Sequence, residues 1–420
     1  MTGRPYVPAA FVAMLTFMLA VVVVVPASEW SAVGIYLVLA AVLGVLLYRN
    51  TIKTVSPSFP ASLFVLALAV KLLFSLSRYW TAVDLYGGAS DAPAYHAEGL
   101  LLAPYFRDFD FSILEWYRFR GAGSTRMAIL TGLVYSVFPS SLAGSFLFFA
   151  VLAFVGSALF YRAVCMSSSD RSIAAYTVFV FFMPSILFWP ASLGKDAWVF
   201  FASGLVAWGW ASFVRRNHFM GLLVVAIALM LINFVRPHIA AFMGASLAAA
   251  YILYATRAIR SVIVWLVGAV VVTGLAYYLI QSGTAFLQLD ELSFEAVEGF
   301  VSEQQARTTI GGSSYATVSV FTPTGAVTGL VTALARPFPW EAHNLQALLI
   351  SLETVGWLAF CWFQRRVFVS KLLAIRRDPF TAFAIFYSLI TLMALTSIGN
   401  FGIIVRQRVM VLPFLWMLFV

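Results

Sequence analysis

The sequence predicts an all-α protein, a polytopic transmembrane bundle of about 12 helices with two long external loops that carry short amphipathic helices. Hydrophobic residues make up 62% of the 420 residues and charged residues only 10%, whereas a soluble chain carries about 25% charged residues. A soluble core of this length could not bury so much apolar surface, but lipid can cover it. The net charge of +9 is spread between apolar runs. It therefore does not indicate a nucleic-acid partner.

Runs of about 20 apolar residues mark the predicted spans. The first run is too long for a typical signal-peptide core, and we interpret it as a retained span. The spans are predicted near residues 9–27, 30–48, 59–78, 141–163, 172–188, 196–214, 218–235, 238–255, 261–280, 344–363, 381–398 and 403–420. The apolar stretch 127–139 is too short to cross and is expected at the membrane surface.

Four regions follow from these runs. They are an N-terminal hairpin (1–58), a transmembrane core (59–280) with the first external loop (79–140), a second external loop (281–343) and C-terminal helices (344–420). Cytoplasmic loops collect Lys and Arg. With the N-terminus inside, the inner segments hold 13 of the 26 Lys and Arg residues but only two acids, Asp170 and Asp378. Carboxylate chemistry is therefore expected at the external face.

The first external loop contains an acid, a tyrosine and a histidine within one short predicted helix. Asp91, Tyr95 and His96 could converge on one face. Asp91 could accept a proton or hold a divalent ion, and so could His96. The alternative is that Asp91 only caps the helix.

A helix break precedes a cation near the outer surface. Two prolines and a glycine between residues 184 and 194 interrupt the helical backbone, and Lys195 and Asp196 open the next helix. Lys195 is a candidate phosphate ligand. The alternatives are a snorkelling lysine and an aspartate that interacts with the helix dipole.

Three arginines lie where the charge rule disfavours them. Arg236 and His238 stand between two apolar spans, and Arg406 and Arg408 are predicted to start the last span from outside. Ionisable groups at membrane depth are often functional. A lipid phosphate or pyrophosphate matches the guanidinium fork. The alternatives are an interfacial turn at Arg236 and an ion pair of the last two arginines with Glu353.

The second external loop is expected to begin with an amphipathic helix over 290–307, ending at Arg307. A flexible segment, 311–314, follows. Near the end of the loop, Glu341 and His343 enter the next span from outside. This loop could be a lid over a site or only a surface loop.

Residues 59–214 resemble the GT-C class of polyprenyl-phosphate-dependent glycosyltransferases. The features that carry the resemblance are Asp91 followed by Tyr95, a surface helix over 126–138, a span ending at Phe160-Tyr161-Arg162, and a proline-aromatic turn (Pro184, Trp189) before Asp196. The resemblance implies that Asp91 is the base or metal ligand, with Asp84 as the rival. Two spans precede the match, and the large soluble C-terminal domain of several such enzymes is missing. The tail with Arg406 and Arg408 is similar to bacterial exopolysaccharide and O-antigen polymerases.

The expected function is transfer of a sugar from a polyprenyl-phosphate- or pyrophosphate-linked donor to a glycan or lipid acceptor, outside a bacterial inner membrane, with both termini cytoplasmic. Asp91 and His96 are the expected catalytic residues. The expected substrate-binding residues are Tyr95, Lys195, Arg236, His238, Arg307, Glu341, His343, Arg406 and Arg408. No metal site is assigned, although a divalent ion is compatible with the acids. The alternatives are a transporter or lipid flippase and an envelope scaffold. The absence of a sequence repeat weighs against transport.

Overall fold

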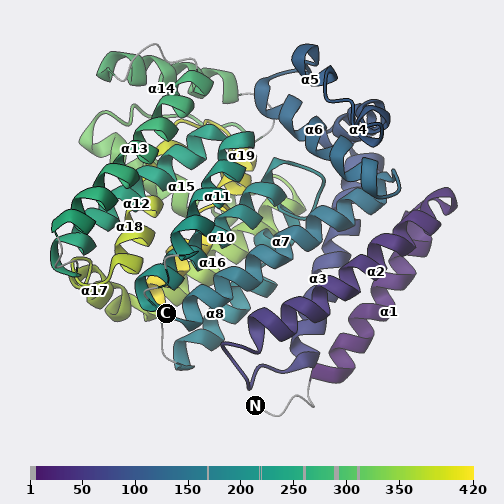
Figure 1. Cartoon of the computed structure of the whole chain (residues 1–420), viewed down its shortest axis with the longest axis horizontal. Helices are drawn as coiled ribbons and strands as arrows, with labels where there is room; N and C mark the ends of the chain where they lie inside the picture. Colours follow the sequence, from purple (N-terminus) through teal and green to yellow (C-terminus); the bar gives the residue numbers. More distant parts are fainter. Residues whose placement is uncertain are drawn as a thin grey trace. The chain divides into compact units, whose positions relative to one another are not determined.

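The computed structural model describes residues 6–167, 170–216, 218, 220–258, 262–287, 293–309 and 313–420. Over these residues the chain is helical, with one isolated β-bridge, Ser314 to Asn400, and no strand (Figure 1). It forms two compact units. Unit 1 is Met1–Asp170 with Thr177–Val235, and unit 2 is Arg171–Tyr176 with Arg236–Val420.

Unit 1 contains ten complete helices among the described residues. They are α1 (Tyr6–Val24), α2 (Trp30–Leu47), α3 (Ala61–Trp80), α4 (Asp91–Arg107), α5 (Ile113–Trp116), α6 (Ala122–Val137), α7 (Leu142–Cys165), α9 (Pro184–Phe188), α10 (Lys195–Arg216) and α11 (Met220–Val235). Helix α8 (Asp170–Phe182) contributes residues to both units.

Unit 2 holds the later helices. They are α12 (Pro237–Ala258), α13 (Val262–Leu287), α14 (Phe294–Thr308), α15 (Pro323–Ala335), α16 (Leu345–Phe363), α17 (Arg365–Leu373), α18 (Pro379–Leu395), α19 (Phe401–Arg408) and α20 (Leu412–Trp416). Within this unit, α12 packs along α13 and α18.

Six helices of the described chain are long and apolar enough to cross a membrane. They are Tyr6–Val24, Ala27–Ile52, Ala61–Leu85, Leu142–Cys165, Lys195–Arg216 and Leu345–Phe363. A bent pair, Phe401–Arg408 with Leu412–Phe419, adds a seventh if it is one span. Five shorter apolar helices accompany them. The chain therefore has the helices of a membrane protein, and the number of about twelve spans stays a prediction.

Two of the expected spans are broken helices. The span expected over 172–188 is interrupted at Met183, whose extended backbone (φ −65°, ψ 125°) precedes Pro184 at the start of α9. Proline disfavours helical backbone at the residue before it. The span expected over 403–420 is divided into α19 and α20, which meet at 60°. Arg406 and Arg408 thus lie in the last turn of a short helix, not at the start of a continuous span.

Glycines let the long helices of unit 1 approach closely. A Cβ atom added at Gly204 would lie 2.5 Å from the carbonyl oxygen of Gly156, so α7 and α10 touch through their backbones. A Cβ at Gly221 would lie 2.4 Å from the carbonyl oxygen of Gly209, between α10 and α11. Small residues at such crossings are typical of helix packing in membranes.

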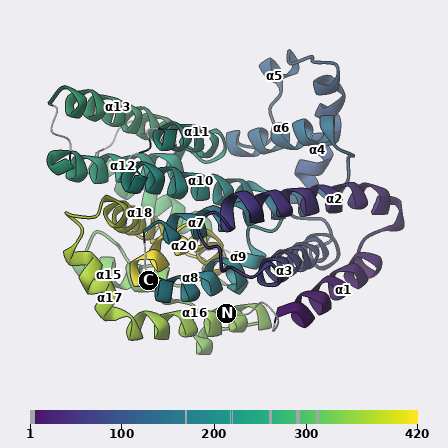
Figure 2. The ribbon, with the colours of Figure 1, turned by 60° about the horizontal axis from the view of Figure 1, so that its bottom comes forward.

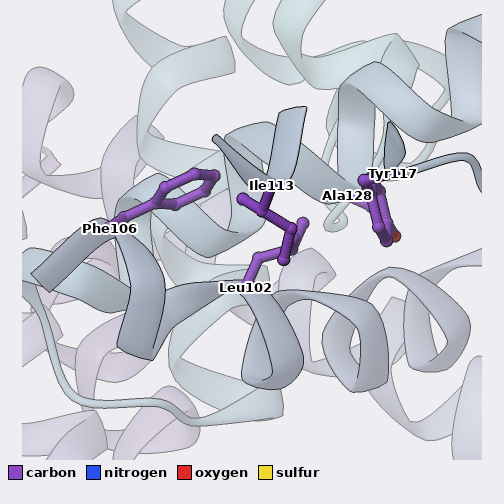
Figure 3. Packing of buried hydrophobic residues seen from close by; sticks show 5 residues of the cluster. All are labelled: Leu102, Phe106, Ile113, Tyr117 and Ala128. Carbon is purple, nitrogen blue, oxygen red and sulfur yellow. The ribbon is translucent and has the colours of Figure 1, made fainter. Parts of the chain in front are cut away.

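The region between α3 and α7 has a small apolar core of its own. Helices α4, α5 and α6 are grouped together in both views (Figures 1 and 2). Their buried side chains form one cluster (Figure 3), made of Leu102, Phe106, Ile113, Tyr117 and Ala128. The first external loop of the sequence prediction is therefore a packed helical cap, which can hold side chains in fixed positions.

Candidate functional site

Three helices of unit 1 bring polar side chains to Ser124. The Lys195 ammonium donates a hydrogen bond to the Ser124 hydroxyl (3.0 Å), and the Tyr95 hydroxyl lies 3.4 Å from the same oxygen. Asp91 is one helical turn before Tyr95 on α4, so the two share a face. We call Asp91, Tyr95, Ser124 and Lys195 the Ser124 cluster. Tyr95 and Lys195 were singled out in the sequence and contact Ser124, which carried no sequence signal, and Asp91 belongs to the cluster through its place one turn before Tyr95.

The carboxylate of the Ser124 cluster is accessible. Asp91 begins α4, and its side chain is 50% exposed. Arg120 forms an ion pair with it at 3.3 Å and is itself 55% exposed. Arg120 has a left-handed backbone (φ 49°), and its guanidinium lies 5.0 Å from the ring of Phe119. Exposed ion pairs contribute little stability, so this pair can open to admit another group.

The ammonium of the cluster stands at the N-terminus of a long helix. Lys195 is the first residue of α10, whose first backbone N–H groups point out of the helix end. The helix dipole adds partial positive charge there. An anion beside Lys195 would be stabilised by both.

A buried lysine supports the turn that leads to Lys195. Lys71 on α3 is 2% exposed, and its ammonium donates to the carbonyls of Ile186 (2.8 Å) and Leu187 (3.3 Å) in α9. The guanidinium of Arg78, two turns further along α3, lies 4.8 Å from the Phe188 ring. These contacts fix α9 against α3, and α9 leads into the turn before α10.

His96 faces another side of α4. It is five residues beyond Asp91, about 140° around the helix. Its Nδ1 lies 2.6 Å from the Tyr135 hydroxyl, which donates to the Ser141 carbonyl at 3.1 Å. A phenol has one proton, so if that proton goes to the Ser141 carbonyl, Nδ1 is protonated and Nε2 is the acceptor. Burial lowers the pKa of His96, and the charge of Glu29 opposes that shift. His96 is thus neutral at pH 7, with Nε2 able to accept a proton.

Unit 2 holds the arginines at the end of the chain, and Arg408 is enclosed by protein oxygens. It is 2% exposed. Its guanidinium donates to the carbonyls of Leu334 (2.6 Å) and Arg336 (3.4 Å) and to the Thr354 hydroxyl (3.1 Å). Arg408 therefore joins the end of α15 to α16. Much of the hydrogen-bonding capacity of its guanidinium is used by these protein oxygens.

Arg236 also has a protein partner. It is 6% exposed, and it donates to the side-chain carbonyl of Gln407 at 2.8 Å, which links the start of α12 to α19. His238 packs its ring edge-on against Phe242, with centroids 6.1 Å apart. Arg406, next to Gln407, is half-buried. Of these cations, Arg406 is the most accessible.

Glu341 is engaged by Arg336. The Arg336 Nε donates to both carboxylate oxygens (2.9 and 3.1 Å), and its guanidinium lies 4.7 Å from the Phe401 ring. Burial alone would raise the pKa of Glu341, but the hydrogen bonds and charge of Arg336, aided by the charge of His343, lower it overall. Tyr315 stacks on Phe401 at 4.5 Å. Glu341 is therefore ionised, and it forms a structural ion pair with Arg336.

The predicted lid residues belong to a tethered segment. Arg307 on α14 pairs with Glu303 one turn earlier, and both are more than half exposed. The helix end is attached to the α18–α19 turn, where the Gly399 N–H donates to the Thr308 hydroxyl (2.8 Å). A Cβ at Gly399 would lie 2.3 Å from the Thr309 hydroxyl oxygen, so a larger residue there would have to displace that side chain. Residues 310–312, and 288–292 at the start of the expected amphipathic helix, lie outside the described residues.

In the described part of the chain, no three His, Cys, Asp or Glu side chains are grouped as a metal site would require. Comparisons of the sequence with protein-family models and with curated proteins, and of the structure with solved structures, find no match. The function is therefore argued from the geometry of the site alone.

Proposed function

We propose that the protein is a membrane glycosyltransferase or polysaccharide polymerase, which transfers a sugar from a polyprenyl-phosphate- or pyrophosphate-linked donor to a glycan or lipid acceptor. The observation that supports it is the Ser124 cluster, because it combines an accessible carboxylate with an ammonium at a helix N-terminus. Glycosyl transfer needs both groups. A base takes a proton from the acceptor, and a cation stabilises the departing phosphate.

In this reaction the acceptor hydroxyl oxygen bonds to the anomeric carbon of the donor sugar. Its proton passes to Asp91, and the bond between that carbon and the phosphate oxygen breaks. The lipid phosphate leaves with the electron pair and gains negative charge, which Lys195 and the α10 N-terminus stabilise. Tyr95 and Ser124 orient the reacting groups, and His96 Nε2 is a second proton acceptor. Arg406, in unit 2, is a separate candidate for binding a lipid-carrier phosphate.

The proposed setting is the external face of a bacterial inner membrane, with about twelve spans and both termini in the cytoplasm. The support is the distribution of charge, since nearly all acids lie in segments assigned to the outside. Cysteines introduced beside Asp91 should react with an impermeant reagent applied from outside, and those beside Arg216 and Arg376 should not. Labelling of only the latter positions contradicts this orientation.

The decisive experiment is transfer from a polyprenyl-phosphate sugar by the full chain in proteoliposomes. Asp91→Asn should lower the rate about a hundredfold. It should leave the thermal unfolding temperature unchanged, because the Arg120 pair is exposed. Asp108→Asn, at another exposed acid close to the end of α4, is the matched control and should transfer normally. Normal transfer by Asp91→Asn with loss in Asp84→Asn would make Asp84 the base.

The second candidate is a transporter or lipid flippase. It is favoured by the helix break at Pro184 and by the buried Lys71 bonded to carbonyls beside that break, because transporters use broken helices to hold their ligands. The two functions differ in product. A flippase moves a fluorescent lipid-linked sugar between leaflets and forms no glycosidic bond, whereas the transferase releases free lipid phosphate. Translocation without release would replace the transferase proposal.

A further inference from the structure

The short helix α17 and its flanks form a basic surface with exposed apolar side chains. Leu373 is 80% exposed, Val369 50% and Phe363 77%. Val369 and Leu373 are four residues apart, so they share one face of the helix. The exposed cations of the segment are Arg365, Arg366, Arg376 and Arg377. We call these apolar residues and arginines the α17 surface.

The positive charge of the α17 surface is not neutralised by nearby acids of its own segment. Residues 362–378 include five Lys and Arg residues and a single acid, Asp378. Asp378 caps α18, where it accepts hydrogen bonds from the Phe380 N–H (3.0 Å) and the Thr381 hydroxyl (2.8 Å). The segment therefore presents a net positive field.

The opposite side of α17 is fixed to the protein. The Phe368 ring stacks on Phe419 at 5.0 Å, and the Lys371 ammonium donates to the Met417 carbonyl at 3.0 Å. The helix also connects two apolar helices, α16, which is long enough to cross a membrane, and α18. Because α17 is anchored on one face and held between these helices, its exposed face is ordered before any ligand arrives.

We propose that the α17 surface binds anionic phospholipid at the membrane interface. Exposed apolar side chains beside arginines match the boundary between acyl chains and headgroups. Arginine forks pair with lipid phosphates. A soluble acidic partner would satisfy the arginines but would leave Val369, Leu373 and Phe363 in water. This inference concerns a surface distinct from the Ser124 cluster and is independent of the proposed sugar transfer.

The test is native mass spectrometry of the full chain titrated with phosphatidylglycerol or phosphatidylcholine. Each basic residue near a membrane surface contributes about a fivefold gain in affinity for anionic lipid. Wild type should therefore bind the first phosphatidylglycerol at least about 25-fold more tightly than phosphatidylcholine. Arg376→Gln/Arg377→Gln removes two such residues and should reduce that preference by about 25-fold.

The matched control is Arg215→Gln/Arg216→Gln, which removes the same charge from two exposed arginines at the end of α10. It should keep most of the preference. Leu373→Ser should weaken binding of both lipids, because it removes apolar contact alone. Thermal unfolding in neutral detergent verifies that every variant is folded. An equal loss in the control pair, an unchanged preference in the Arg376/Arg377 variant, or tighter binding of a soluble acidic peptide than of lipid would overturn the proposal.

Discussion

Lys195 in unit 1 and Arg408 in unit 2 are both cations that the charge rule disfavours, yet their surroundings differ. Lys195 donates to a neutral serine hydroxyl, and the accessible carboxylate of Asp91 lies on the neighbouring face of α4 that carries Tyr95. Arg408 is buried and bonded to two carbonyls and a threonine. A hydroxyl can exchange for a phosphate oxygen at little cost, whereas a buried guanidinium whose partners are protein oxygens cannot leave them without a desolvation penalty. A cation at a position where the charge rule does not expect one can therefore either bind a ligand or stabilise the fold.

The largest expected effect is structural and concerns Arg408. Arg408→Met removes the donor for the buried Thr354 hydroxyl and for the partly buried carbonyls of Leu334 and Arg336, and each orphaned buried group costs about 1–3 kcal/mol. We expect a loss of roughly 3 kcal/mol or more in the free energy of unfolding. Thermal unfolding in detergent measures it as a Tm lower by several degrees. An unchanged Tm combined with weaker binding of a polyprenyl-phosphate analogue would instead make Arg408 a ligand residue and remove the contrast with Lys195.

The next largest effect is expected on binding of the lipid-linked sugar donor by Lys195 in unit 1 and by Arg406 in unit 2. Lys195→Met should weaken binding of a polyprenyl-phosphate analogue by about tenfold or more, because a charge-assisted hydrogen bond is lost. Its Tm should change little. Arg406→Lys keeps the charge but loses the two-pronged geometry, and it should weaken pyrophosphate analogues more than monophosphates. If both variants bound every analogue as tightly as the wild type, neither Lys195 nor Arg406 would belong to a phosphate site.

A smaller effect is expected from His96 when the pH is lowered. Burial holds the pKa of His96 below its ordinary value of 6.5. The unfolded chain therefore binds this proton at a higher pH than the folded chain. Stability is complete above about pH 6.5 and falls as the pH drops toward the folded pKa. Wild type should lose more stability than His96→Gln between about pH 7.5 and about pH 5. Parallel pH profiles would show that another group governs the loss.

The smallest effect is expected at Arg307. Its pair with Glu303 is exposed on both sides, so Arg307→Gln should change the free energy of unfolding by less than about 0.5 kcal/mol. This variant is the stability control for Arg408→Met. A large fall in Tm would mean that the α14 segment contributes more to unit 2 than its exposed contacts indicate.

The sequence predicted the helical class because apolar runs of membrane-crossing length leave few alternatives. The spans expected to start at residues 30, 141, 196 and 344 agree within one residue with helices that begin at Trp30, Leu142, Lys195 and Leu345. The prolines indicated the interruption at Pro184, although the expected span was drawn through it. The break after Arg408 was not predicted, because an apolar run reads alike whether its backbone is continuous or bent. Helix α15, which opens at Pro323, was missed because it lies in a segment interpreted as loop.

The candidate site likewise contains residues that the sequence indicated and contacts that only the structure revealed. Asp91, Tyr95 and Lys195 could be selected from the sequence, since ionisable and phenolic groups stand out between apolar runs. Tyr95 of α4 and Lys195 of α10 both reach Ser124 of α6, and a serine at position 124 has no distinguishing local pattern. The hydrogen bond from Nδ1 of His96 to Tyr135 likewise joins residues 39 positions apart.

Composition and periodicity by themselves determined that the chain has the helices of a membrane protein and that its acids are concentrated in a few segments. Each apolar run shows this independently, because polar groups exposed to lipid are costly in every membrane-crossing segment. Only the tertiary structure decided which protein oxygens each of these cations reaches. The partners of Arg408 are backbone carbonyls at Leu334 and Arg336. Every residue carries such a carbonyl, so no sequence pattern marks the ones that a distant arginine will reach.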